Sequence, residues 1–171
     1  SLDLSTNVNL EQLKSSGNNI LSLDIQNKLF LTYINCGGTN PNAIVNLNNL
    51  PSLLEVDGFG GNIKEFTMSG VDNLTHLKLK SNNLTTLDAS NMISAQLIDV
   101  GNNYNLASLF VKNCANEIVY KGVNIGQSLL QYICGDETQV SSLQYGFSGV
   151  VNSYCSFVPG GIFYDLQGTS T

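Results

Sequence analysis

The sequence lacks most of the residues that enzymes and nucleic-acid-binding proteins rely on. It has no tryptophan, one histidine, and only 12% charged residues in 171. A single histidine without a C-x-x-C pair cannot complete the common zinc motifs. Seven basic residues stand against 13 acidic ones, a net charge of −6. Binding of nucleic acid needs a basic stripe that neutralises phosphates, so the composition argues against such a partner.

Long apolar runs are also missing. No stretch of about 18 apolar residues occurs, and therefore no membrane insertion is expected. The chain is nevertheless 42% hydrophobic, which is enough to build a core and argues against disorder. Its polar surface is expected to consist of Asn, Ser, Thr and Gly rather than charges, a composition typical of secreted bacterial repeat proteins.

Apolar residues recur with a period of 21 to 22 residues in two interleaved series of short triplets. The triplets of the first series begin at Leu13, Ile34, Val56, Leu77 and Ile98. Those of the second series, half a period out of phase, begin at Leu2, Leu23, Val45, Phe66, Leu87 and Leu109. Within a triplet the outer residues point inward and the middle one outward, as in a short strand. Two series with one period predict a solenoid with two short strands in every coil.

The turns after the first series have a recurring asparagine. Asn18, Asn82 and Asn103 occupy this slot, and Thr39 and Gly61 occupy it in the other coils. An Asn side chain can donate to and accept from the backbone of adjacent coils, so a polar ladder is predicted there. No segment has helical spacing, except that residues 49–53 are predicted to hold one helical or 3₁₀ turn.

Residues 74–84 read L-x-x-L-x-L-x-x-N-x-L, the leucine-rich-repeat consensus, and residues 84–91 and 31–36 have the related L-x-x-L-D and L-x-x-I-x-C patterns. On these residues the chain resembles the short, internalin-like leucine-rich repeats of secreted Bacteroidetes proteins. Ser15 and Gly58 stand where the family has a large apolar residue. The resemblance implies a mainly β leucine-rich-repeat solenoid over residues 1–114, with a small irregular C-terminal cap.

The period stops at Ala115, so residues 115–171 are expected to form this cap and a junction to a further domain. Residues 118–120 are expected to cover the open end of the stack, and the acidic pair Asp136 and Glu137 favours the start of a short helix. Residues 152–164 resemble a junction in surface proteins exported by type IX secretion. This resemblance implies a secreted or cell-surface location.

The four cysteines have different expected roles. Cys36 lies at an inward strand position and is expected to be a buried free thiol. Cys134 and Cys155 could form a disulfide that closes a loop of about 22 residues and contributes roughly 3 kcal/mol. Two free thiols are the alternative. No cofactor or metal site is expected, because the Asp and Asn residues follow no calcium-loop spacing.

Catalysis would need a constellation of reactive side chains, and none is apparent in the sequence. His76 is predicted to point outward beside lysines rather than toward a nucleophile and an orienting carboxylate. The outward residues of the first series instead form a candidate binding patch, because aromatic and charged side chains are common in interface hot spots. Its members are Tyr33, Asn35, Glu55, Asp57, Phe59, His76, Lys78 and Asp99. The alternative is a solvated sheet face with scattered aromatic residues.

These observations favour a non-enzymatic, monomeric, secreted or cell-surface module that binds a protein or a carbohydrate, as in adhesion. Two alternatives remain open. The solenoid could be a structural spacer that binds nothing tightly, or an accessory region of a larger secreted hydrolase.

Overall fold

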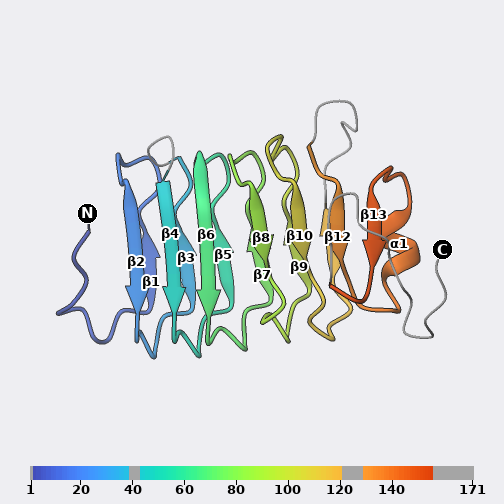
Figure 1. Cartoon of the computed structure of the whole chain (residues 1–171). Helices are drawn as coiled ribbons and strands as arrows, with labels where there is room; N and C mark the ends of the chain where they lie inside the picture. The colour runs from blue at the N-terminus through green and yellow to red at the C-terminus, as the bar shows by residue number, and fades with distance from the viewer. Residues whose placement is uncertain (1, 39–42, 121–128, 156–171) are drawn as a thin grey trace.

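The computed structural model describes residues 2–38, 43–120 and 129–155. Within them the chain winds into a parallel β-solenoid with thirteen short strands and one short helix (Figure 1). Successive coils stack from the N-terminal to the C-terminal end, and from β1 to β12 each contributes one strand to either flank. The structure confirms the predicted mainly β solenoid with short strands.

One flank is a six-stranded parallel sheet, here called the main sheet. Its order is β1-β3-β5-β7-β9-β11, so each strand pairs with the corresponding strand of the next coil. The strands are β1 (Gln12–Lys14), β3 (Tyr33–Asn35), β5 (Glu55–Asp57), β7 (His76–Lys78), β9 (Leu97–Asp99) and β11 (Ile118–Tyr120).

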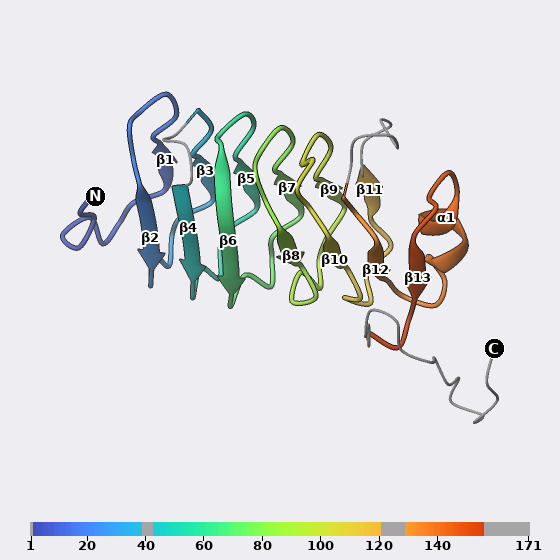
Figure 2. The ribbon, with the colours of Figure 1, turned by 45° about the horizontal axis from the view of Figure 1, so that its top comes forward.

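The opposite flank is divided into two parallel sheets (Figure 2). A three-stranded sheet has the order β2-β4-β6 and a four-stranded sheet has the order β13-β12-β10-β8. The strands are β2 (Ser22–Gln26), β4 (Ala43–Asn48), β6 (Ile63–Ser69), β8 (Thr86–Asp88), β10 (Ser108–Phe110), β12 (Tyr132–Cys134) and β13 (Val150–Asn152).

The core lies between the two flanks and consists of the predicted inward residues. Ile34, Val56, Leu77 and Ile98 are fully buried at the centres of their main-sheet strands. Their counterparts on the other flank, such as Leu87, are buried as well. Because strands in a parallel pair align residue by residue, these side chains stack in continuous apolar rows along the solenoid.

The two irregular core positions have local explanations. A Cβ on Gly58 would lie 2.9 Å from a methyl carbon of Leu79 and 3.1 Å from one of Ile63, so these neighbours already fill the space. Ser15 is buried, and its hydroxyl donates to the Asn35 carbonyl at 3.2 Å. Small residues therefore fit here without leaving a cavity or an unsatisfied polar group.

The turns after the main-sheet strands share one backbone conformation. A residue with positive φ recurs once per coil, and the series is Gly17, Gly38, Gly60, Ser81 and Asn102, with φ values between 58° and 71°. At Gly38 an added Cβ would also come within 3.3 Å of the Gly17 backbone nitrogen. The repeat of the sequence therefore sets both which residues are buried and where the backbone takes a positive φ.

One local prediction was wrong, and two were right only in part. Residues 2–4 form no strand; instead Lys28, which is buried, donates from Nζ to the Leu4 carbonyl at 2.7 Å. Residues 49–53 contain a turn but no helix. The predicted short helix is present as α1 (Val140–Gln144), but it begins after the acidic pair and has no acidic residue in its first turn. Asp136 instead accepts the backbone N–H groups of Asn113 and Cys114.

Strand pairing continues past residue 114, the expected end of the repeats. β11 pairs with β9 in register, and β12 and β13 extend the four-stranded sheet. Helix α1 lies beside β13 at the C-terminal end of the stack (Figure 1). Among the described residues, no helix is long and apolar enough to span a membrane.

Candidate functional site

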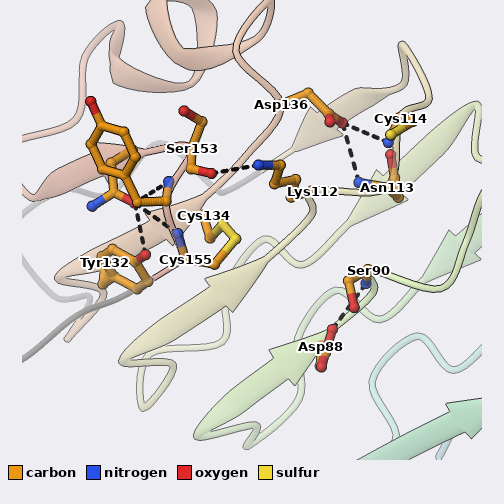
Figure 3. Close-up of a disulfide and its surroundings, with 12 residues drawn as sticks. Asp88, Ser90, Lys112, Asn113, Cys114, Tyr132, Cys134, Asp136, Ser153 and Cys155 are labelled. Atoms are coloured by element: carbon orange, nitrogen blue, oxygen red, sulfur yellow. Dashed lines mark hydrogen bonds between the residues drawn. A yellow bond between two sulfur atoms is a disulfide. The ribbon is translucent and has the colours of Figure 1, made fainter. Parts of the chain in front are cut away.

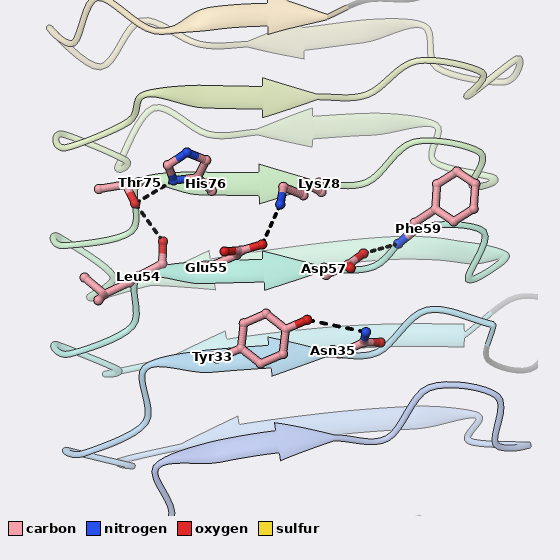
Figure 4. A network of polar contacts seen from close by, with 9 residues as sticks. All are labelled: Tyr33, Asn35, Leu54, Glu55, Asp57, Phe59, Thr75, His76 and Lys78. Atoms are coloured by element: carbon pink, nitrogen blue, oxygen red, sulfur yellow. Dashed lines mark hydrogen bonds and ion pairs between the residues drawn. The ribbon is translucent and has the colours of Figure 1, made fainter.

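Strand register brings the predicted site residues onto one surface, the outward side of the main sheet, here called the main face. Tyr33, Glu55 and His76 pair side by side across β3, β5 and β7. A second row contains Asn35, Asp57, Lys78 and Asp99. Phe59 follows in the turn after β5. Figure 4 shows seven of these eight side chains together; it does not draw Asp99.

The centre of the main face contains an ion pair. Lys78 Nζ lies 2.6 Å from Glu55 Oε1 and is partly exposed. Lys78 and Asp57 occupy paired positions, yet the ammonium contacts the carboxylate on the diagonal (Figure 4). The hydrogen bond to Glu55 raises the pKa of Lys78, and the charges of Glu55 and Asp57 and the nearby Tyr33 add to this effect. Because the pair is partly exposed, its net contribution to stability is small.

The second row has a structural role that sequence reasoning missed. Asp57 Oδ1 accepts the N–H of Phe59 at 3.1 Å, and Asp99 Oδ1 accepts that of Gly101 at 3.0 Å. Asn35 does the same for Gly37 at 3.3 Å. These Asx turns shape the bend after each strand. The available signal was an Asp or Asn two residues before a glycine or aromatic residue of the turn, but these residues were predicted only as members of the candidate binding patch.

The two aromatic side chains differ in exposure. Phe59 is 59% exposed at the turn, and its amide is fixed by Asp57. Tyr33 is half-buried, and its hydroxyl accepts from Asn35 Nδ2 at 3.5 Å. A Cβ on Gly37 would collide with the Phe59 carbonyl oxygen, so the glycine permits this close approach of neighbouring turns. The backbone that carries both rings is therefore fixed by hydrogen bonds, at Tyr33 by strand pairing and at Phe59 by Asp57.

His76 has only local polar contacts. Its Nδ1 lies 2.9 Å from Thr75 Oγ1, and that hydroxyl donates to the Leu54 carbonyl at 2.9 Å. The tautomer of the ring decides which of the two groups is the donor. No carboxylate hydrogen-bonds to this ring in the described part of the chain. The same residues contain no group of three or more His, Cys, Asp or Glu placed to hold a metal ion.

Two cysteines form a disulfide at the C-terminal end. Cys134 of β12 is bonded to Cys155 (Figure 3), so of the two alternatives left open by the sequence the disulfide is the one present. Lys112 Nζ donates to the Ser153 carbonyl at 2.7 Å close by. The disulfide therefore fastens the segment that follows the last strand to the buried interior of the solenoid.

The remaining thiols are free. Cys36 is fully buried, as predicted, and burial raises the pKa of its thiol to about 12, with a further contribution from the Asp57 charge. Cys114 is exposed. Because the thiolate is the reactive form, Cys36 is chemically inert and Cys114 is the accessible thiol.

The asparagine ladder is present in part. Asn82 and Asn103 are buried and connect adjacent coils, whereas Asn18 is exposed and bonds only to its own turn. Thr39 lies outside the described residues. No protein-family model, no curated protein and no solved structure matches the chain.

Proposed function

We propose that the chain is a non-enzymatic, leucine-rich-repeat-like module of a secreted or cell-surface protein, which binds a protein or a glycan through its main face. One observation carries this proposal. In-register parallel pairing places Tyr33, Glu55, Lys78 and the exposed ring of Phe59 on one surface.

The physical case rests on rigidity. Each strand of the main face is paired on both sides from β3 to β9, and Asx turns fix the bends that follow. Little conformational entropy is therefore lost when a partner binds, and this loss is one of the main costs of association. Aromatic side chains next to charged ones are enriched among the residues that dominate binding energies.

The disulfide supports the proposed location. Disulfides form and persist in oxidising compartments such as the extracellular space, and they are rare in the cytosol. The Cys134–Cys155 bond fits a secreted or surface-exposed protein. The surroundings of His76 support a non-enzymatic role, because the ring contacts a hydroxyl that also hydrogen-bonds to the backbone.

The test is a binding screen on an array of glycans and extracellular-matrix proteins. The wild-type chain is compared with a Tyr33→Ala/Phe59→Ala double variant. The matched control is Phe30→Ala/Tyr104→Ala, which also removes one phenylalanine and one tyrosine but leaves the main face intact. Circular dichroism confirms that all three proteins are folded.

We expect a signal that the main-face variant loses and the control variant keeps. Equal loss in both variants, or a signal that the main-face variant keeps, would place binding elsewhere. A folded wild-type protein without any signal would contradict the proposal and favour a spacer role.

A further inference from the structure

A hollow of about 290 Å³ lies on the outer surface of the β2-β4-β6 sheet, on the flank opposite the main face. Its floor includes Leu47, which is buried, and Met68, which is half-buried. Six polar side chains project around this floor: Asp24, Gln26, Asn46, Asn48, Thr67 and Ser69. We call this surface the polar hollow.

Strand register arranges the six polar side chains as a grid. Asp24, Asn46 and Thr67 form one row across the three strands. Gln26, Asn48 and Ser69 form the next row. Neighbouring strands lie about 4.8 Å apart, so hydrogen-bonding groups recur at that interval across the hollow.

The side chains hold one another in place. Thr67 Oγ1 lies 2.6 Å from Asn46 Oδ1, and Ser69 Oγ lies 2.7 Å from Asn48 Oδ1. Gln26 Nε2 donates to both oxygens of Asp24, at 3.1 and 2.9 Å. An amide and a hydroxyl have more hydrogen-bonding positions than one mutual bond uses. Each Asn–hydroxyl pair therefore keeps both donors and acceptors available to a ligand.

We propose that the polar hollow binds a segment of a neutral oligosaccharide. Sugar hydroxyls both donate and accept, which matches the mixed capacity of the Asn–hydroxyl pairs. Asp24 is the only charged residue of the lining and no cation accompanies it, so a phosphate or a uronic acid would meet repulsion. The strand spacing is close to the length of one sugar ring, so successive rings of an oligosaccharide can meet successive Asn–hydroxyl pairs.

A protein partner fits this surface less well. The lining contains no aromatic residue and no arginine, which are the residues that anchor most protein–protein interfaces. The main face has the opposite character, with two aromatic rings and an ion pair. The polar hollow is therefore a second site with its own ligand chemistry, independent of the function proposed for the main face.

The test is isothermal titration of the full chain with three neutral hexasaccharides: cellohexaose, mannohexaose and chitohexaose. Hexagalacturonate is the anionic comparison. The key variant is Thr67→Val/Ser69→Ala, which removes both hydroxyls at outward strand positions and preserves side-chain volume. The control is Tyr33→Ala/Phe59→Ala, which changes only the main face.

We expect at least one neutral hexasaccharide to bind, with an affinity about tenfold lower in the double hydroxyl variant, since two hydrogen bonds are lost. A Thr67→Arg variant, which fills the hollow, should abolish binding while its melting temperature stays close to that of the wild type. The Tyr33→Ala/Phe59→Ala variant should bind as the wild type does.

Three results would overturn this proposal. These are no binding of any neutral hexasaccharide, undiminished binding by both hollow variants, and stronger binding of hexagalacturonate. None of them bears on the main face, because the array experiment uses a different pair of residues on the other flank.

Discussion

Asn82 provides the sharpest test of how the coils are held together. Its side chain is 4% exposed and bridges neighbouring segments with both ends of the amide. Oδ1 accepts the N–H of Ile63 at 2.9 Å, and Nδ2 donates to the carbonyls of Gly58 and Leu79, each at 2.8 Å. Asn82→Ala would leave the Ile63 N–H and the Gly58 carbonyl without their partner, whereas the Leu79 carbonyl keeps a hydrogen bond from Asn103 Nδ2 at 2.8 Å.

Each buried group without a partner costs about 1–3 kcal/mol. Both of the groups left without a partner, the Ile63 N–H and the Gly58 carbonyl, belong to the coil before that of Asn82, so the substitution removes a bridge between coils. We expect Asn82→Ala to lower the free energy of unfolding by roughly 3 kcal/mol or more, which would be a large effect for a single substitution.

The chain supplies its own control in Asn18. This residue occupies the same slot of the repeat, but it is exposed and bonds only to the carbonyls of Ser15 and Ser16. Asn18→Ala should cost less than about 1 kcal/mol. Urea unfolding with the disulfide intact measures both values by linear extrapolation. Equal destabilisation by the two substitutions would refute the reasoning that the ladder is a bridge between coils.

Four further predictions follow from burial and titration. Leu77→Asp places an unpaired charge in the core and should lower the free energy of unfolding by more than about 4 kcal/mol. Lys78→Ala, on the outward side of the same strand, should lower it by less than about 1 kcal/mol. Thermal melting followed by circular dichroism compares the two variants. Thiol titration without reductant should find one reactive thiol in the native protein, Cys114, and two in denaturant; a count of four would exclude the disulfide. The pKa of the Cys36 thiol is near its ordinary value of 9.0 in the unfolded chain, and burial raises it to about 12 in the folded chain. As pH rises, the unfolded chain therefore releases the proton first, and the free energy of unfolding falls between these two pKa values by up to about 1.4 kcal/mol per pH unit. Urea unfolding of a Cys36→Ala variant should show a free energy of unfolding that lacks this part of the decrease with pH. Replacing Cys134 and Cys155 by serine should cost roughly 3 kcal/mol in the same assay.

Much of the solenoid could be predicted from the sequence, because the apolar residues that are buried in each coil recur with the period of the coils. Ile34, Val56 and Leu77 face inward as the 21- to 22-residue spacing requires. The missed strands β12 and β13 depart from that spacing. The step from Leu109 to Ile133 is 24 residues and the next, to Val151, is 18. Coils of unequal length pair equally well, because pairing depends on register within the strand and not on the length of the turns.

The candidate site was predictable only in its outline. Alternation placed Glu55 and Lys78 on the same face, but the diagonal contact between them depends on side-chain reach, which spacing does not encode. The turn-capping role of Asp57 and Asp99 was missed, since the same residue type serves both a solvated surface and an Asx turn. The polar hollow lies on strands that pair in the register of the apolar series at Leu23, Val45 and Phe66, but its depth depends on side-chain packing, which spacing does not encode.

The central functional claim is that binding uses the outward residues of the main face. The most direct measurement is chemical-shift mapping by NMR, in which an array ligand whose signal the Tyr33→Ala/Phe59→Ala variant loses is titrated into the ¹⁵N-labelled chain. The account predicts that the largest shifts cluster on the backbone amides of Tyr33, Glu55, Phe59 and Lys78. Shifts that cluster instead on the opposite flank or on the C-terminal segment would contradict it.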